Sequence, residues 1–420
     1  MVFNAKRLCL AAAALLVAGT QSAALNKENI EKRALTFNYG GVKVRGVNLG
    51  GWLLTEPWIT PSIYDSVPGA VDEWTLCQYI GKDACYGKLS NHWNNFITAD
   101  DFYQIAAAGL NHVRIPIGYW AVRMRDGDPF VSGQLDILDR AIGWARAAGL
   151  KVWIDLHGAP GSQNGFDNSG YRDHLEWQTG NNQQLTVEVI RTLSQRYAQS
   201  SYNDVVTAIE LLNEPLGPNL SRSKIEQYWY DGWGTVRDSS PDVAVVIGDG
   251  FFDPNSWNGF MTSGFNNVIL DTHTYQVFSP GELSRDINAH VGAACGVGNN
   301  IRTTDKWTVV GEWSAARTDC TKYLNGVGRG ARWEGNFGGS QYFGACGNRY
   351  SGSVAAYSAE EKANTRAYIE AQLDAYERNA GWFFWTWKTE GAPDWDMKDL
   401  LANGLFPQPL TQRYANRCGY

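Results

Sequence analysis

Several motifs that mark common classes of enzyme are missing from this chain of 420 residues. No apolar run leads into G-x-G-x-x-G or a Walker loop, which argues against binding of dinucleotides and nucleoside triphosphates. There is no G-x-S-x-G, because Ser162 lies in Pro-Gly-Ser-Gln, and no H-E-x-x-H among the six scattered histidines. No two cysteines have the C-x-x-C spacing of a zinc site. We therefore expect neither a metal nor a cofactor.

Positive charge is also in short supply. The chain has 36 Lys and Arg against 43 Asp and Glu, which gives a net charge of −7. A basic cluster is missing from the sequence that follows the N-terminal region. Both observations argue against nucleic acid as a partner, because polyanions bind to clustered Lys and Arg.

The N-terminus is typical of a targeting segment. Lys6 and Arg7 precede an apolar run over residues 8–18, and small residues follow as far as Ala24. The run is too short to span a membrane, so we expect no membrane span. The pattern predicts a signal peptide over residues 1–25 and a protein that is secreted, to the extracellular space or the cell wall.

A dibasic pair, Lys32-Arg33, follows the predicted signal peptide. It suggests a propeptide over residues 26–33 and a mature chain over residues 34–420, with a solvated charged turn as the alternative interpretation.

Seven cysteines are present, and Cys9 lies in the predicted signal peptide. Six remain in the mature chain: Cys77, Cys85, Cys295, Cys320, Cys346 and Cys418. An even number in a secreted chain predicts three disulfides, and six cysteines allow 15 pairings. The short spacing favours a local bridge between Cys77 and Cys85. Asn219, in Asn219-Leu220-Ser221, is a candidate site of N-glycosylation.

Strand-like and helix-like segments alternate along the mature chain. Eight apolar runs predict strands, at 42–48, 112–118, 151–156, 205–212, 243–247, 268–270, 308–311 and 381–386. Helical patterns lie between most of them, at 100–108, 135–148, 183–197, 224–237, 280–294 and 359–378. Such alternation implies parallel pairing. We predict an α/β fold, a single-domain (β/α)8 TIM barrel with long βα loops, with a doubly wound open sheet as the competing layout.

A polar or aromatic residue ends nearly every predicted strand. These residues are Arg114, His157, Asn213, Glu214, His273, Tyr275, Glu312 and Trp385. A single one is more often a structural group, and Asn-Glu-Pro at 213–215 also suits a helix cap or a turn. The carboxyl ends of barrel strands, however, converge on one mouth, so eight such residues predict one shared pocket.

Two carboxylates, Glu214 and Glu312, end the fourth and seventh predicted strands. Glycoside hydrolysis uses such a pair, with one carboxyl protonated beside the leaving oxygen and the other ionised beneath the anomeric carbon. We expect Arg114 and Tyr275 to donate hydrogen bonds to Glu312 and keep it ionised. We expect His273 to bond Glu214 or substrate.

Two further strand-end residues suit contacts with a sugar. The amide of Asn213 is suited to a sugar 2-hydroxyl, and the indole of Trp385 to stacking beneath a sugar ring. The 18 Trp and 20 Tyr of the chain are in keeping with such stacking, although many must lie in the core.

Seven stretches spread over the mature chain carry a resemblance to a known family. They are GVNLGGWLLTEPWITPS, HVRIPIGYWA, DLHGAPGSQNGFDNSG, ELLNEPLG, DTHTYQVFSP, VVGEWSAARTDC and FFWTWKTEGAPDW, with GLFPQP near the end. The blocks HGAPGSQNGFDNSG and KTEGAPDW are the most specific. With these motifs the chain resembles glycoside hydrolase family 5, and within it the fungal secreted exo-β-1,3-glucanases.

The resemblance implies a (β/α)8 barrel and retaining hydrolysis that releases glucose from the non-reducing end of β-1,3-glucan, with transglucosylation as a further activity. By motif position, Glu214 matches the acid/base and Glu312 the nucleophile. Arg114, His157, Asn213, His273, Tyr275 and Trp385 match other site residues of the family. Glu56, Asp167 and Asn168 match positions that close the pocket around the terminal glucose, and Phe166 and Phe278 match a pair that clamps the next sugar. Trp58 stands where related enzymes have Tyr and is included among the substrate-binding candidates.

The family pattern also implies the bridges Cys295–Cys418 and Cys320–Cys346, and we expect a monomer. For a retaining enzyme the two carboxyl groups should lie about 5–5.5 Å apart. Two alternatives stay open: another family 5 enzyme, such as an endoglucanase, mannanase or β-glucosidase, and a non-catalytic glucan-binding wall protein. The presence of both Glu214 and Glu312 speaks against the second.

Overall fold

A computed structural model describes residues 36–420 and contains a closed barrel of eight parallel strands. The strands are β1 Val44–Asn48, β2 His112–Gly118, β3 Lys151–Gly158, β4 Val206–Glu210, β5 Ala244–Gly248, β6 Val268–Thr274, β7 Trp307–Trp313 and β8 Gly381–Phe384. Each strand pairs with the next, and β8 closes the barrel on β1. The predicted (β/α)8 fold is confirmed, and the doubly wound layout is wrong. The predicted signal peptide and propeptide lie outside the described residues.

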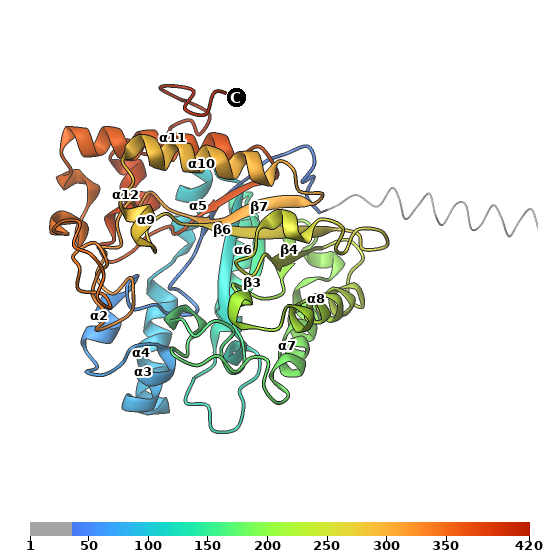
Figure 1. Ribbon diagram of the computed structural model, residues 1–420. Helices are drawn as coiled ribbons and strands as arrows, with labels where there is room; N and C mark the ends of the chain where they lie inside the picture. The colour runs from blue at the N-terminus through green and yellow to red at the C-terminus, as the bar shows by residue number, and fades with distance from the viewer. Residues whose placement is uncertain (1–35) are drawn as a thin grey trace, which may run out of the picture.

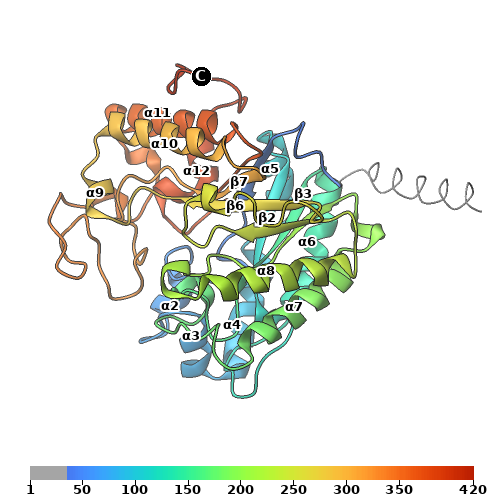
Figure 2. The same cartoon turned by 45° about the vertical axis from the view of Figure 1, so that its right-hand side comes forward.

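Helices surround the barrel (Figure 1). The longer ones are α5 Ala99–Ala107, α6 Gln134–Ala148, α7 Asn182–Tyr197, α8 Arg222–Arg237, α10 Ile287–Ile301 and α11 Ala359–Tyr376. Neighbouring helices pack in pairs, and both views show α7 beside α8 and α10 beside α11 (Figure 2). Between β5 and β6 the connection contains only a short 3₁₀ turn, η5 Pro254–Trp257. The outer layer therefore has no long helix at this point of the described chain.

The long connection between β1 and β2 contains helices that the sequence patterns did not predict. It contains three helices before α5, namely α2 Pro61–Asp65, α3 Glu73–Ile80 and α4 Lys82–Asn95. Helix α5 is capped by Thr98, because Thr98 and Asp101 form a reciprocal capping box.

The helix expected over residues 280–294 is two helices, α9 Pro280–Leu283 and α10. Ser279 and Asp286 each bond a backbone N–H and start a new helix, which explains the break between them. A further short helix, α12 Met397–Ala402, follows β8.

Three disulfides tie peripheral segments together. Cys77–Cys85 joins α3 to α4, Cys295–Cys418 joins α10 to the C-terminal segment, and Cys320–Cys346 closes the long loop after β7. These are the three pairings that spacing and resemblance suggested. Asn219 lies exposed on the surface, as a glycosylated residue must. Within residues 36–420 no helix combines the length and the apolarity needed to cross a membrane.

Candidate active site

The polar residues predicted at the strand ends meet at the carboxyl end of the barrel. Arg114, His157, His273 and Glu312 lie on β2, β3, β6 and β7, whereas Asn213, Glu214, Tyr275 and Trp385 follow the ends of their strands. The position of Glu214 needs a correction, because β4 ends at Glu210 and not beside Asn213. Glu214 has a φ of 44°, a conformation that non-glycine residues seldom adopt and that is found at functional sites.

The carboxyl groups of Glu214 and Glu312 face each other. One oxygen of each lies within 4.8 Å of the other and of a ring nitrogen of His273. Both side chains are at least nine-tenths buried. Carboxyl groups of retaining glycosidases lie about 5–5.5 Å apart, and those of inverting enzymes about 6.5–9.5 Å apart. The observed approach matches the retaining class.

Glu312 accepts two hydrogen bonds from the residues predicted to donate them. Arg114 Nη1 lies 3.0 Å from Oε1, and the Tyr275 hydroxyl lies 2.7 Å from Oε2. A cation and a hydroxyl donor both stabilise the ionised form of a carboxyl group.

Glu214 has different partners. His273 Nδ1 lies 2.8 Å from Oε1, and Asn168 Nδ2 donates to Oε2 over 3.2 Å. The other ring nitrogen of His273 lies 3.0 Å from Asp271 Oδ2. His273 therefore bridges Glu214 and Asp271 through its two ring nitrogens.

Arg114 is the centre of the site. Its Nε and Nη2 donate to the two oxygens of Glu210 over 2.7 and 2.8 Å. Nη1 also donates to Asn48, and Nη2 to the carbonyl oxygen of the Asn213 amide over 2.9 Å. Asp155 Oδ2 lies 3.1 Å from Nη2. The guanidinium thus holds Asn213 and Glu312 in fixed orientations.

Sequence reasoning missed three carboxylates beneath the site: Asp155, Glu210 and Asp271. All three are fully buried on strands that were interpreted as apolar. A signal was present, because buried carboxylates are found almost only with a partner. Asp155 and Asp271 lie two residues before His157 and His273, so each carboxylate is on the same face of its strand as the histidine that was predicted. Glu210 is the last residue of β4.

Three of the buried carboxyl groups have raised pKa values. Burial raises the pKa of Asp155 and of Glu312 to about 7 and the pKa of Glu210 to about 8, although Arg114 opposes the shift. Burial also raises the pKa of Glu214, but the hydrogen bond and charge of His273 outweigh it and hold this pKa below 4.5. Burial lowers the pKa of His273, yet the carboxylates of Glu312 and Asp271 bring it well above 6.5.

His157 fixes the other side of Asn213. Burial lowers the pKa of His157 to about 3, so the ring is neutral. Its Nδ1 donates to Asp155 over 2.6 Å, and its Nε2 accepts from the amide nitrogen of Asn213, at 3.3 Å. The ring stacks on Trp385 with 5.4 Å between centroids. The side chain of Asn213 is therefore used in the site and not in a helix cap.

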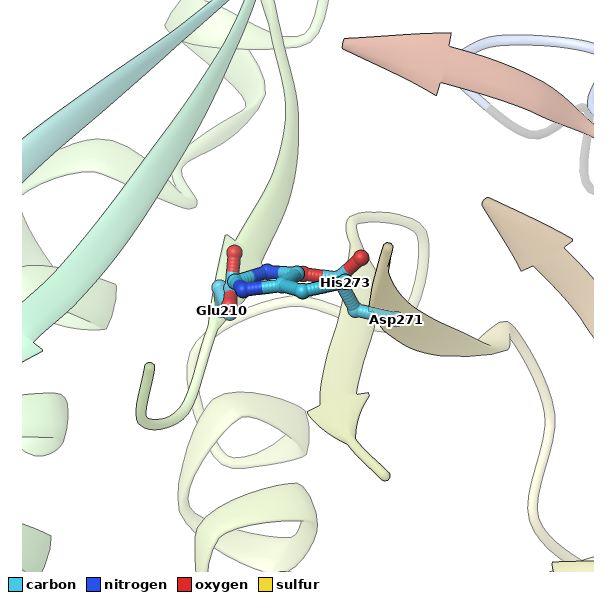
Figure 3. Close-up of side chains that lie close together, drawn as sticks. All are labelled: Glu210, Asp271 and His273. Carbon is cyan, nitrogen blue, oxygen red and sulfur yellow. The ribbon is translucent and has the colours of Figure 1, made fainter. Parts of the chain in front are cut away.

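Glu210, Asp271 and His273 face one another from β4 and β6 (Figure 3). Their potential ligand atoms lie within 4.8 Å of one another, a grouping that suits a metal ion by distance alone. The chemistry does not fit, because both oxygens of Glu210 accept hydrogen bonds from Arg114. The guanidinium supplies the positive charge that a metal would bring.

A pocket of about 320 Å³ opens in front of the two carboxylates. Among the predicted residues its lining contains Glu56, Trp58, Phe166, Asp167, Asn168, Tyr275, Phe278 and Trp385. Trp58 Nε1 donates to Glu56 over 2.9 Å, so the indole keeps a hydrogen-bonding role. Phe166 and Phe278 are about two-fifths exposed, at 40% and 41%.

The loop after β7 forms a wall of this pocket. Three residues of this loop, Arg329, Arg332 and Phe337, line the pocket. Arg329 pairs with Asp173, and Arg172 Nη1 donates to the carbonyl of Val327 over 3.0 Å. These contacts join the β3 and β7 loops. Phe251, Leu324, Asn325 and Trp395 are further lining residues that sequence reasoning missed.

Comparison with known proteins agrees with this geometry. The model of the cellulase family, glycosyl hydrolase family 5, matches residues 77–391. The chain belongs to glycosyl hydrolase family 5. Its curated relatives include a protein of Aspergillus niger named "probable glucan 1,3-beta-glucosidase A", 54% identical over 422 residues and the full length of both chains. Another is a "glucan 1,3-beta-glucosidase" of Blumeria graminis, 53% identical over 398 residues and 93% of each chain.

A solved structure with the same fold is the rutinosidase from Aspergillus niger. The TM-score is 0.71 at 21% identity, with 88% of this chain and 99% of that chain covered. At this identity the likeness supports the barrel of this family 5 chain and says nothing about its substrate.

Proposed function

We propose that this family 5 chain is a secreted, monomeric, retaining exo-β-1,3-glucanase. It releases glucose from the non-reducing end of β-1,3-glucan. The observation that carries the proposal is the approach of Glu214 and Glu312 within 4.8 Å at the base of a walled pocket. The names of the two fungal relatives, at more than half identity over nearly the whole chain, support the choice of glucan.

In the first step, a carboxylate oxygen of Glu312 attacks the anomeric carbon while Glu214 protonates the leaving glycosidic oxygen. The bond between the anomeric carbon and that oxygen breaks, and a glucosyl ester of Glu312 forms. Arg114 and Tyr275 orient the attacking carboxylate. The amide of Asn213, held by Arg114 and His157, is placed to bond the 2-hydroxyl.

In the second step, Glu214 takes a proton from water, and the water oxygen attacks the anomeric carbon. The ester bond to Glu312 breaks, and glucose leaves with its original configuration. A sugar hydroxyl in place of water gives transglucosylation by the same movements. Glu214 loses its proton in the first step and regains one from water in the second, so the complete cycle returns the enzyme to its starting state.

The proposed roles need a proton on Glu214 and a charge on Glu312. The pKa values taken alone indicate the opposite, since the pKa of Glu312 is raised and that of Glu214 is lowered. We assign the roles from the hydrogen-bond donors. The two donors on Glu312 favour the carboxylate form, whereas Glu214 shares a hydrogen bond with His273, whose pKa is raised. A proton on His273 reaches Glu214 by moving along one 2.8 Å hydrogen bond, without any movement of heavy atoms.

The walls of the pocket favour removal of terminal sugars over cleavage within a chain. Asp167 Oδ2 is buried and has no hydrogen-bond partner among residues 36–420, so a sugar hydroxyl would satisfy it. The loops after β3 and β7 are joined by the contacts of Arg172 and Arg329, and we expect this wall to stop a longer glucan from running past the site. Phe166 and Phe278 stand exposed at the lining and offer apolar faces to the next sugar.

Product analysis on laminarin tests the exo assignment. Glucose as the sole early product is the expected result, and a ladder of oligosaccharides would reassign the enzyme to endo action. Binding of laminarin without release of any reducing sugar would favour the non-catalytic alternative. Proton NMR of the first product tests the stereochemistry: the β-anomer is expected, and the α-anomer would contradict the retaining mechanism.

A further inference from the structure

A second cavity adjoins the sugar pocket at Glu214. It has a volume of about 280 Å³. Its inner lining contains Glu210, Glu214, Asp271 and His273, and its outer lining contains Phe251, Phe252, Pro254, Val297 and Asn300. Glu214 and Phe251 also line the sugar pocket, so the two cavities adjoin at these residues.

The local sequence explains why the cavity exists. β5 runs into Gly248-Asp249-Gly250, and the two glycines place no side chain in this space. The connection to β6 carries the 3₁₀ turn η5 where other units carry a long helix. Phe251 is 44% exposed, and Phe252, Pro254, Val297 and Asn300 are partly exposed. The cavity therefore extends from the surface to the carboxylates.

The inner end of the cavity has the polar groups that ordered water requires. Asp271 is only 1% exposed, and its Oδ1 has no hydrogen-bond partner among the described residues. Asp249 lies beside it and bonds the Thr272 hydroxyl. A buried water needs two to four polar partners and a small share of this volume. The cavity meets both conditions.

The second step of the proposed reaction needs a water molecule beside Glu214. That water must take the position that the leaving glycosidic oxygen has vacated, because the second step is the reverse of the first with water in place of the sugar hydroxyl. Water held in the second cavity is already next to the base that must activate it, and it does not have to pass the mouth.

We propose that this second cavity is a water-binding site that supplies the hydrolytic water to Glu214. The inference rests on the proposed role of Glu214 as acid/base. The supplied water loses a proton to Glu214, its oxygen bonds to the anomeric carbon, and the bond from that carbon to Glu312 breaks. The cavity thereby favours hydrolysis over transfer to a sugar hydroxyl, which must arrive through the mouth.

A cavity-filling substitution tests the route. Val297, on α10, lines the outer part of the cavity and takes no part in the catalytic groups. Val297→Trp should obstruct the cavity, whereas the matched Val297→Ala should widen it. With laminaritriose as donor and acceptor, the ratio of transfer products to free glucose should rise roughly threefold in Val297→Trp, about the effect of losing one water-mediated hydrogen bond. In Val297→Ala the ratio should stay the same or fall.

The value of kcat/KM serves as the control for the first step and should be unchanged in both variants, since glucosylation of Glu312 needs no water. Gly248→Ala offers a second obstruction if Val297→Trp does not fold. A Cβ at Gly248 meets only Leu212 O at 3.5 Å and Pro215 Cδ at 3.8 Å, which are ordinary contacts. It should raise the ratio in the same direction by a smaller amount.

An unchanged ratio in the obstructed variants, with kcat/KM intact, would overturn the water route and leave the proposed function standing. An equal rise in Val297→Ala would overturn it as well, because widening would then act like obstruction. Failure of the wild-type chain to release glucose from laminaritriose would reject the proposed function, and the route with it.

Discussion

The two halves of the barrel interior are built from the same strands and differ completely in chemistry. On β3, Trp153 faces the interior in the lower half, and Asp155 and His157 follow at the next two positions on that face. On β6, Ile269 is followed in the same way by Asp271 and His273. Within two residues each strand changes from packing to charge. Position along the strand, not the choice of strand, decides which task a residue performs.

The lower half is a close-packed apolar core. It contains Val44, Trp153, Ala208, Ala244, Val246, Ile269, Val309 and Phe383, all of them completely buried. Phe383 lies 4.7 Å from Trp153 between ring centroids. A Cβ added at Gly46 would lie 2.2 Å from the Phe383 ring, so only glycine fits beneath it. This half holds the strands in register.

The upper half of the barrel interior has no comparable stabilisation from the burial of apolar side chains. Asp155, Glu210, Asp271 and Glu312 surround the single guanidinium of Arg114. Buried ion pairs contribute little net stability, because desolvation offsets their attraction. The comparison teaches that stability is concentrated at the lower end of the barrel and that the polar upper end serves chemistry. The predictions below test this separation.

The largest effect is expected from Glu312→Gln. Loss of the nucleophile should reduce kcat on laminarin by on the order of 10⁴-fold or more, while the thermal midpoint stays the same or rises because a buried charge is removed. The control is Glu188→Gln on α7, which should retain full activity. Near-normal turnover in Glu312→Gln would reassign the nucleophile, and a large fall in midpoint would show that the upper half is needed for stability too.

Phe383→Ala probes the lower half. Removal of a fully buried ring should destabilise the protein by about 3–5 kcal/mol. The kcat of the remaining folded protein should be unchanged, because Phe383 contacts none of the site residues described above. Chemical denaturation and activity below the unfolding transition are the measurements. Tyr103→Ala, at a residue 52% exposed, is the control and should change stability little. A selective fall in kcat in Phe383→Ala would contradict the separation of the two halves.

Asp155 should make stability depend on pH. Its pKa is raised from 3.8 to about 7 by burial, so between these values the folded chain holds a proton that the unfolded chain releases. Stability should therefore fall as pH rises through that window, by up to ~1.4 kcal/mol per pH unit for this group.

Thermal unfolding between pH 4 and pH 8 measures this dependence. The decline should be shallower in Asp155→Asn, and the exposed control Asp136→Asn should follow the wild type. Ile269→Val, in the lower half, should lower the whole curve without changing its slope. Parallel curves for Asp155→Asn and wild type would show that another group sets the pH dependence.

The smallest effect is expected at the pocket wall, from Trp58→Phe. This change removes the 2.9 Å hydrogen bond to Glu56 and keeps most of the ring. KM for laminarin should rise roughly three- to tenfold with little change in kcat, the effect of one hydrogen bond made equally in ground and transition states. Initial-rate kinetics on laminarin measure KM and kcat of this variant. A drop in kcat with KM unchanged would mean that the indole acts in the transition state.

Most of the fold was predictable because its signals are local. The alternation of strand and helix patterns identified all eight strands and the parallel barrel. Boundaries were less certain, as β4 shows. Leu211 and Leu212 look like strand residues, and Leu211 N still donates to Val246 O of β5, but β4 ends at Glu210. The chain then turns at Glu214, which has a positive φ. Asn-Glu-Pro at 213–215 suits a turn, but the pattern does not specify that Glu214 adopts a positive φ.

The candidate site was predictable in its upper layer and not below it. The strand-end residues can be recognised in the sequence because polar groups interrupt apolar runs. Asp155, Glu210 and Asp271 did not stand out, because Arg114, the cation that they share, is remote in sequence. Arg114 and Glu210 are separated by 96 positions, and Arg114 and Glu312 by 198.

The sequence by itself determined the barrel, the residues at its carboxyl end and the pair of glutamates, since each follows from periodicity or from a short motif. The tertiary structure alone decided which groups meet. Barrel closure brings β2, β4 and β7 around one guanidinium, and folding of the β3 and β7 loops against each other makes the pocket wall. It also left a cavity beside Glu214, where two glycines and a missing helix leave space unfilled. These features depend on distances between segments far apart in the chain, which periodicity cannot encode.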